Sequence, residues 1–212
     1  MKSALVTGAT GLVGEALVQQ LLQNSIYKSV ELWVRKDPGI KHPKLHITVI
    51  PDWNAASVLP EKKFDDVFCA LGTTIATAKT QERFREIEVS IPVAIARAVK
   101  QAGARKFIYV SALGADRQSN IFYNRCKGEI EAELSNLKFP VLLILRPSLL
   151  LGNRKEFRAG ELFFRKVSEP FRFLVPKLWR PIHASEVARA MIYYANGNLT
   201  GNQILENDRL FV

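Results

Sequence analysis

Three glycines near the start of the chain, Gly8, Gly11 and Gly14, have the spacing of a turn that binds a dinucleotide. An apolar run, Ala4–Val6, precedes them, and an amphipathic stretch ending near Asn24 follows. In such a strand–turn–helix unit the glycines permit a tight turn, close approach of the backbone to a pyrophosphate, and close helix packing. Free N–H groups at the helix N-terminus then face the phosphates. Cofactor contacts are expected from Gly8, Thr10, Gly11, Leu12, Val13 and Gly14.

Two cations after the next apolar run predict which dinucleotide is bound. The run Val30–Val34 is followed by Arg35 and Lys36. A site for NAD usually carries Asp or Glu there, about 20 residues after the glycines, on the adenosine ribose. Arg35 and Lys36 instead suit a ribose 2′-phosphate. Charged hydrogen bonds of about 1.5 to 3 kcal/mol predict a roughly 10- to 150-fold preference for NADP over NAD. The alternative is a solvated Arg–Lys pair at a strand end.

Three further side chains have the types and spacing for acid–base chemistry. Ser111 follows an apolar run, and Tyr123 and Lys127 are four residues apart, which places them on one face of a helix. A free tyrosine has a pKa of about 10. A nearby ammonium and a cationic nicotinamide ring would favour the phenolate, and a pKa of about 7 needs roughly 4 kcal/mol of differential stabilisation. Ser111 would then hold the substrate oxygen beside Tyr123.

The elements that must position these groups alternate along the chain. Buried parallel strands are predicted at Ile47–Ile50, Val67–Leu71, Phe107–Val110 and Val141–Leu145. Between them, Gln81–Gln101 has apolar residues at helical spacing, with a kink expected at Pro92. Asp65 and Asp66 are interpreted as the start of a strand or a turn cap, not as a catalytic pair.

Parallel strands joined in this way cross over right-handedly and bind ligands beyond their carboxyl ends. The sequence therefore predicts an α/β fold: a doubly wound parallel sheet of the NAD(P)-binding Rossmann type, forming one domain over residues 1–212.

Composition narrows the class of protein. The chain has 212 residues, of which 48% are hydrophobic, enough for one domain with a full core. The first strand begins near Met1 and no apolar run has the length of a membrane span, so we expect a cytoplasmic protein without a signal peptide. In that compartment Cys69 and Cys126 are expected to be free thiols. Because His183 lacks neighbouring metal ligands, no metal site is expected.

The formal net charge of +10 is concentrated at residues 151–181. This segment has eight Lys or Arg against three Glu, interleaved with aromatic side chains. We interpret it as a lid over a substrate pocket, with contact to an acidic partner or a membrane surface as the alternative. Nucleic acid is not an expected partner, because no nucleic-acid motif accompanies the charge.

Taken together, these motifs resemble those of the short-chain dehydrogenase/reductase superfamily. The resemblance rests on the glycine turn, on Ser111, on Tyr123 with Lys127, and on the segment Arg180–Ala188. The chain is similar to an atypical branch of the superfamily, related to the Tat-interacting protein. That similarity is carried by Tyr109–Asp116, Phe122–Glu131 and Arg146–Ser148. It covers nearly the whole chain and implies a Rossmann-like single domain that binds NADP(H).

The resemblance also implies roles for single residues. Tyr123 would donate or accept a proton, Lys127 would hold the nicotinamide ribose, and Ser111 would orient the substrate. Many members place an asparagine on the helix before the Ser111 strand, where it fixes a water, and here that position holds Glu88. A carboxylate there can organise water, and if buried it would raise the pKa of the tyrosine. Weaker cofactor contacts are implied at Asp52, Leu71, Gly72, Thr73, Pro147 and Ser148.

Two functional hypotheses follow. The leading one is an NADP(H)-dependent oxidoreductase that acts on a carbonyl or alcohol carbon of a small-molecule substrate. The alternative is an NADP(H)-binding sensor or regulatory protein that binds a protein partner with little or no turnover. A sugar-nucleotide epimerase is less favoured, because such relatives add a sizeable C-terminal substrate domain. A homodimer is compatible with the resemblance, since dimers are common in the superfamily.

Overall fold

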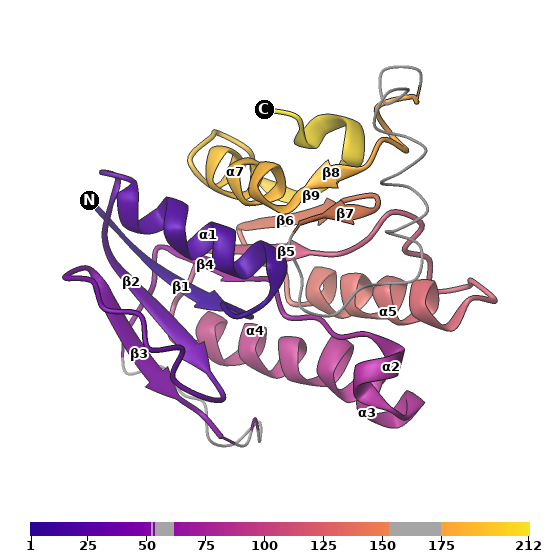
Figure 1. Cartoon of the computed structure of the whole chain (residues 1–212), viewed down its shortest axis with the longest axis horizontal. Coiled ribbons are helices and arrows are strands. Elements are labelled where there is room, and N and C mark those ends of the chain that lie inside the picture. The colour runs from indigo at the N-terminus through magenta and orange to yellow at the C-terminus, as the bar shows by residue number, and fades with distance from the viewer. Residues whose placement is uncertain (52, 54–61, 153–174) are drawn as a thin grey trace.

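Parallel strands form the central sheet in the computed structural model of the chain, which describes residues 1–51, 53, 62–152 and 175–212 (Figure 1). In this described part the sheet has seven strands in the order β3-β2-β1-β4-β5-β6-β9, and all neighbouring pairs are parallel. The strands are β1 (Lys2–Thr7), β2 (Tyr27–Val34), β3 (Leu45–Val49), β4 (Asp66–Cys69), β5 (Lys106–Val110), β6 (Val141–Arg146) and β9 (Gly201–Glu206). The strand order reverses between β1 and β4, which is where such sheets bind ligands. The predicted doubly wound Rossmann-type fold is confirmed.

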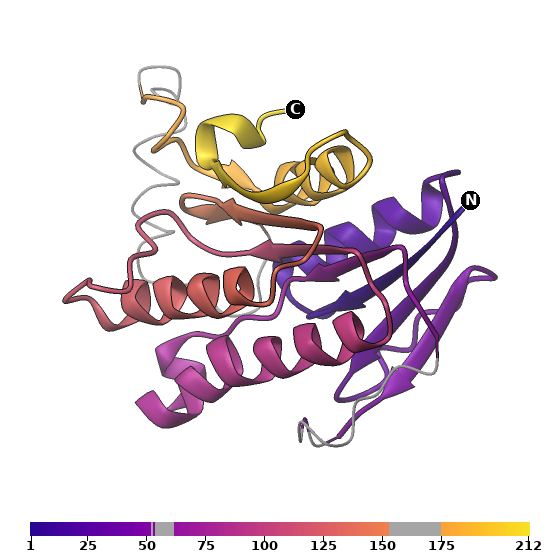
Figure 2. The ribbon, with the colours of Figure 1, turned by 180° about the vertical axis from the view of Figure 1, so that it is seen from behind.

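Helices cover both faces of the sheet (Figures 1 and 2). On one face lie α1 (Leu12–Gln23) and α7 (Ala184–Ala195), and on the other lie α3 (Gln81–Arg85), α4 (Ile91–Gln101) and α5 (Phe122–Asn136). Side chains of β1 point alternately to the two faces of the sheet. Val6 belongs to the core on the first face, with Leu17, and Leu5 belongs to the core on the second face, with Ile95. Smaller elements are α2 (Ile75–Ala78), the paired strands β7 (Leu150–Leu151) and β8 (Ile182–His183), and the 3₁₀ helix η3 (Asn207–Leu210).

The helix predicted over Gln81–Gln101 contains a π-helical segment, η1 (Glu86–Ser90), between α3 and α4. Pro92 has no N–H to donate to the carbonyl of Glu88, four residues earlier. The N–H of Ile91 instead donates to the carbonyl of Glu86, five residues earlier. The helix therefore widens before the proline, where a simple kink was expected. The widened turn carries Glu88, whose side chain is buried.

Most predicted elements lie within a few residues of the observed ones, and Asp66 does begin β4. The last strand, β9, is absent from the sequence prediction. It lies at the sheet edge and buries only Leu205 completely, so it lacks the continuous apolar run that marks the other strands. Cys69 and Cys126 are both buried and free, as predicted.

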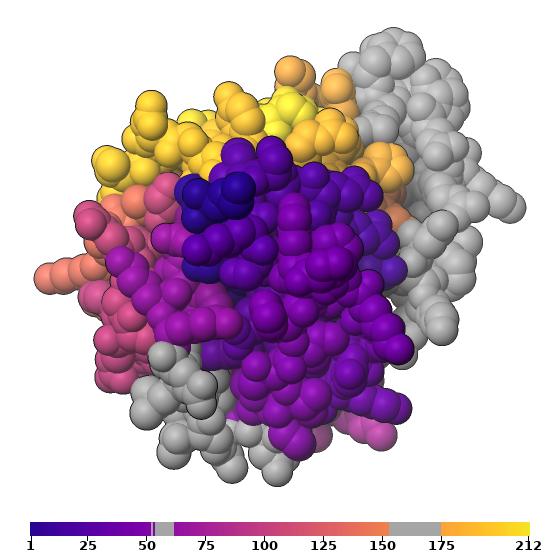
Figure 3. Space-filling view, turned by 90° about the vertical axis from the view of Figure 1, so that its left-hand side faces the viewer, coloured from indigo at the N-terminus to yellow at the C-terminus, as the bar shows by residue number. Residues whose placement is uncertain are grey.

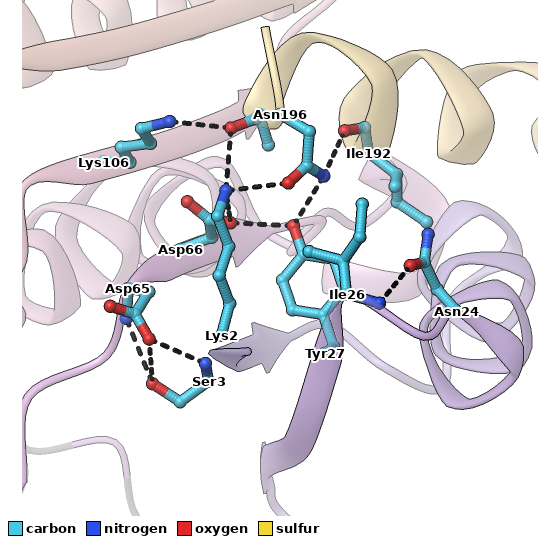
Figure 4. Close-up of polar contacts among 11 residues, drawn as sticks. Lys2, Ser3, Asn24, Ile26, Tyr27, Asp65, Asp66, Lys106, Ile192 and Asn196 are labelled. Carbon is cyan, nitrogen blue, oxygen red and sulfur yellow. Dashed lines mark hydrogen bonds and ion pairs between the residues drawn. The ribbon is translucent and has the colours of Figure 1, made fainter.

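The edge of the sheet opposite the glycine turn carries a polar network around the buried carboxylate of Asp66 (Figure 4). One oxygen, Oδ2, accepts the Tyr27 hydroxyl at 2.7 Å and the Lys2 ammonium at 3.0 Å. Asn196, just after α7, donates to the Tyr27 hydroxyl and accepts from Lys2. Lys106 donates to the carbonyl of Ala195. The network thus joins β1, β2 and β4 to the C-terminal end of α7.

The first residues lie at the surface, close to segments from the end of the chain (Figure 3). Among the described residues, no helix combines the length and apolar character needed to cross a membrane. Residues 153–174, the larger part of the predicted lid at 151–181, lie outside the described residues.

Candidate active site

The glycine turn joins β1 to α1 with little free space around its backbone. Gly8 has φ +79°, and a Cβ atom there would lie 2.4 Å from the carbonyl of Ala70. A Cβ on Gly14 would lie 2.0 Å from the carbonyl oxygen of Gly8. Both positions therefore require glycine, for the conformation and for the close approach of helix to strand. The N–H of Gly11 donates to the carbonyl of Gly8 at 3.0 Å, which closes the turn.

The start of α1 suits the phosphates of a dinucleotide. The helix begins at Leu12, and no side chain caps its N-terminus within the described structure. The N–H groups of its first turn and the positive end of the helix dipole are therefore available to an anion. Thr10 is exposed at the top of the turn, whereas Val13 points into the core. The residues present fit the phosphates of an NAD(P) cofactor.

Strand register brings other predicted cofactor residues to the same edge. Thr7 pairs with Trp33 on β2 and with Cys69 on β4, so the segments that follow these partners flank the turn. Arg35 and Lys36 follow β2 and are exposed. Leu71, Gly72 and Thr73 follow β4. Asp52, the predicted adenine contact, lies outside the described residues.

The predicted acid–base residues also meet at this edge. Ser111 directly follows β5 and is 4% exposed, and its N–H donates to the carbonyl of Leu145. Tyr123 and Lys127 lie one turn apart on α5, as their spacing predicts. The Tyr123 ring is half-buried, with its centroid 6.0 Å from that of Phe84.

Lys127 is enclosed by polar partners. Its ammonium pairs with Glu88 at 2.7 Å and donates to the Tyr109 hydroxyl at 3.1 Å and to the carbonyl of Val110 at 3.4 Å. Burial is the largest single influence and would lower the pKa of Lys127. The charge of Glu88, then Tyr109 and Tyr123, together with the contact to Glu88 outweigh burial and raise that pKa well above its usual value. Lys127 is therefore a fixed cation beside Tyr123.

Ser111 has a partner that the sequence did not predict. Its hydroxyl donates to the Glu131 carboxylate at 2.5 Å. Glu131 is in turn held by Arg146 through two hydrogen bonds, of 2.6 and 3.0 Å, and Arg146 also donates to Glu206 at the end of β9. Hydrogen bonding to Glu131, aided by the charges of both carboxylates, raises the pKa of Arg146 although burial opposes it. Tyr123, Lys127 and Glu131 recur every four residues on α5, a spacing that could have identified Glu131.

The loop after β6 is fixed by another unpredicted residue, Asn207. Its side chain accepts the N–H of Ser148 and donates to the carbonyls of Lys177 and Arg180. The Ser148 hydroxyl also donates to the carbonyl of Arg180. Pro147 and Ser148 follow β6, next to the segment after β5 that carries Ser111, and the N–H of Leu113 donates to the carbonyl of Pro147 at 2.8 Å. No motif in the sequence marked Asn207.

The remaining candidates have structural roles. His183 precedes α7, and its N–H donates to Glu186 in the first turn of the helix. No cluster of metal ligands is present among the described residues. Cys126 is buried, and burial raises the pKa of its thiol.

Comparison of the sequence with known proteins identifies relatives of this chain. A sequence model described as the NAD dependent epimerase/dehydratase family matches residues 4–120. The protein FMP52, mitochondrial, from Debaryomyces hansenii is 33% identical over 207 residues, covering 93% of this chain and 89% of that protein. Because this relative is named mitochondrial, the expected cytoplasmic location is contradicted. Residues at the start of a chain do not by themselves reveal its compartment.

Solved structures share the fold at low sequence identity. The Bordetella bronchiseptica enzyme WbmH in complex with NAD+ superposes with a TM-score of 0.73 at 16% identity, over 97% of this chain and 75% of that one. A short chain dehydrogenase family protein from Francisella tularensis has a TM-score of 0.68 at 16% identity, over 100% of this chain and 94% of that one. Both support the Rossmann-type fold.

Proposed function

Because the chain belongs to the NAD dependent epimerase/dehydratase family, we propose that it is an NADP(H)-dependent oxidoreductase that acts on a carbonyl or alcohol carbon. We place it in the atypical short-chain dehydrogenase/reductase branch related to the Tat-interacting protein. One observation carries the proposal: the buried Lys127 lies one helical turn from the half-buried Tyr123, at the same sheet edge as the glycine turn.

In this proposal each group has a separate task. The bound cofactor supplies or accepts the hydride. The glycine turn and the start of α1 hold the phosphates, and Arg35 with Lys36 binds the 2′-phosphate. Tyr123 exchanges the proton with the substrate oxygen. Lys127 fixes the electrostatic environment of Tyr123, and Ser111, held by Glu131, orients the substrate.

The first experiment measures NADPH oxidation with a panel of aldehydes, ketones and quinones, beside the variant Tyr123→Phe. Loss of the proton donor should lower kcat by about 100- to 10,000-fold while NADPH binding stays within roughly threefold. Tyr193→Phe is the matched control, because Tyr193 is 61% exposed on α7 and outside the site. Turnover by Tyr123→Phe at the wild-type rate would refute the assignment. A nucleotide sugar in the panel tests for epimerase activity.

The choice of cofactor has its own test. Arg35→Ala should lower NADPH affinity by about 10-fold or more and leave NADH affinity nearly unchanged, because only NADPH carries the 2′-phosphate. Lys28→Ala serves as the control, because Lys28 is an exposed cation near the start of β2, the strand that Arg35 follows. Equal loss of affinity for both cofactors would contradict the proposal.

A cofactor-binding sensor with little turnover is the second candidate. The observation that favours it is that Lys127 and Ser111 already have side-chain partners: Lys127 pairs with Glu88, and Ser111 donates a hydrogen bond to Glu131. Tight NADPH binding, combined with turnover that is independent of Tyr123, would support this candidate. We also infer a mitochondrial location from the name of the Debaryomyces hansenii relative, to be tested by subcellular fractionation.

A further inference from the structure

The hydroxyl of Ser111 is held by a buried carboxylate. Its oxygen lies 2.5 Å from Oε1 of Glu131, and the two residues are 4% and 6% exposed. The oxygens of Glu131 also accept from Nε and Nη2 of Arg146, at 3.0 and 2.6 Å. The third nitrogen of that guanidinium, Nη1, donates to Glu206 at 2.9 Å. Side chains from α5, β6 and β9 are thus joined behind Ser111.

The direction of the hydrogen bond between Ser111 and Glu131 follows from Arg146. A guanidinium only donates, and its planar fork faces both oxygens of Glu131, so this carboxylate accepts at both. A serine hydroxyl has one hydrogen and two lone pairs. Ser111 is therefore the donor, and its single hydrogen lies toward Glu131. A hydrogen bond to a charged group favours that orientation by roughly 10- to 150-fold over one directed elsewhere.

Only lone pairs of the Ser111 hydroxyl remain for a ligand. The N–H of the same residue is already used, because it donates to the carbonyl of Leu145 at 2.7 Å. Within the part of the chain that the structure describes, no group donates to the hydroxyl oxygen of Ser111. Ser111 follows β5 at the edge of the sheet where such folds bind ligands. A ligand group that reaches this hydroxyl therefore meets a hydrogen-bond acceptor.

The nearby cations on α5 do not change what Ser111 offers. An ammonium has three hydrogens, and that of Lys127 already contacts three acceptors. These are the Glu88 carboxylate, the Tyr109 hydroxyl and the carbonyl of Val110. Arg125 is exposed and donates to the carbonyl of Ser119. Neither cation supplies a hydrogen at Ser111 to replace the one that Glu131 holds.

We propose that Glu131 is a positioning residue that keeps Ser111 a hydrogen-bond acceptor, so that the site selects carbonyl substrates with a hydroxyl on the neighbouring carbon. A carbonyl oxygen has no hydrogen, and against Ser111 it would place two acceptors together. The hydroxyl on the next carbon is the nearest group of such a substrate that can donate. In the reverse reaction the same contact selects a vicinal diol.

This inference rests on the proposed function and adds its substrate class, an α-hydroxy aldehyde or ketone. The reaction itself is unchanged: hydride adds to the carbonyl carbon, the π electrons move to oxygen, and that oxygen takes a proton. The neighbouring hydroxyl neither forms nor loses a covalent bond. Its contact with Ser111 is present before and during the reaction, so we expect the preference mainly in KM.

Matched substrates test this preference. Hydroxyacetone carries the donor, methoxyacetone keeps the oxygen without its hydrogen, and butanone replaces the hydroxyl with a methyl group of similar size. With NADPH, kcat/KM for hydroxyacetone should exceed that for each of the other two by about tenfold or more. The pair 2-hydroxyacetophenone and acetophenone should show a similar difference. Turnover of carbonyls with no preference for the hydroxylated member of either set would overturn the inference.

Variants assign the preference to single residues through the ratio of kcat/KM for hydroxyacetone to that for methoxyacetone. Ser111→Ala removes the acceptor and should bring this ratio to within about twofold of one. Glu131→Gln should lower the ratio about threefold or more, because a neutral amide holds the Ser111 hydrogen less strongly. Glu133→Gln is the matched control and should keep the wild-type ratio, since Glu133 on the same helix is 37% exposed and pairs with Arg97.

The ratio separates positioning from damage to the fold, because a loss of folded enzyme lowers both rates alike. An unchanged ratio in Ser111→Ala or in Glu131→Gln would therefore overturn the inference.

The position of the Ser111 hydrogen can also be measured without turnover and without any variant. Neutron diffraction from wild-type crystals exchanged into D2O should show deuterium between the Ser111 oxygen and Glu131. Deuterium directed away from Glu131 would overturn the inference and leave the oxidoreductase intact. Absence of NADPH binding, or of turnover with every carbonyl tested, would instead refute the proposed function.

Discussion

Replacing Tyr27 with phenylalanine should destabilise the protein through one hydrogen bond at the edge of the sheet remote from the candidate site. Tyr27 is fully buried, and its hydroxyl donates to Asp66 at 2.7 Å (Figure 4). Phenylalanine has the same shape without the hydroxyl, so no cavity is created beyond one oxygen. Asn196 loses one acceptor but still donates to the carbonyl of Ile192.

The expected loss of unfolding free energy depends on how many partners remain for the Asp66 carboxylate. A hydrogen bond to a charged group contributes about 1.5 to 3 kcal/mol. The second oxygen of Asp66, Oδ1, has no hydrogen-bond partner among the described residues, so Lys2 alone would remain to solvate this buried group. We therefore expect the upper part of that range, about 2 to 3 kcal/mol. For a domain of this size the melting temperature should fall by roughly 4 to 12 °C.

Urea denaturation at neutral pH measures this difference, with Tyr193→Phe as the exposed control that should stay within about 0.5 kcal/mol of wild type. Burial, then the charge of Asp66, raises the pKa of Tyr27 far above its usual value. The stabilisation is therefore fully present below the unfolded-state pKa of about 10 and declines as pH rises beyond it. A Tyr27→Phe protein within about 0.5 kcal/mol of wild type at neutral pH would refute this reasoning.

Three further predictions concern the turn, the β6 loop and acid stability. Gly14→Ala should weaken NADPH binding by more than about tenfold in a fluorescence titration, because its Cβ would lie 2.0 Å from the carbonyl oxygen of Gly8; undiminished affinity would contradict this. Asn207→Ala should lower the free energy of unfolding by roughly 3 kcal/mol, since three hydrogen bonds are lost, including that to Ser148; a loss under about 1 kcal/mol in urea would argue against it. Burial would raise the pKa of Asp65, but two hydrogen bonds from Ser3 and the charges of Lys2 and Lys63 outweigh it, so the pKa of Asp65 is lowered. Its stabilisation is present above the unfolded-state pKa of about 4 and is lost as pH falls through the folded value, so Asp65→Asn should show a flatter acid denaturation curve.

The glycine turn and the Tyr123–Lys127 pair could be located from the sequence because each depends on local geometry. The turn needs residues without Cβ atoms at fixed spacing, and residues four apart on a helix share a face. Apolar runs marked the buried strands for the same reason, whereas β9, a mostly exposed edge strand, had no such signal. The mitochondrial name of a relative shows that the cytoplasmic prediction exceeded what the sequence contained.

The partners of the site residues depend on packing between distant segments. Glu88 lies 39 positions before Lys127, and Ser111 lies 20 positions before Glu131, so neither contact follows from a local repeat. The π-helical segment before Pro92 carries Glu88 with its side chain buried, and the sequence predicted only a kink there.

The sequence by itself determined the alternation of strands and helices, the glycine turn and the face shared by Tyr123 and Lys127, because steric and periodic rules act within a few residues. The tertiary structure decided which charges surround those groups. Burial removes water from an ammonium or a carboxylate, and the charge is then costly unless a group of opposite charge lies beside it. That partner can come from anywhere in the chain, and here Glu88 and Glu131 are the ones that packing brought to the site.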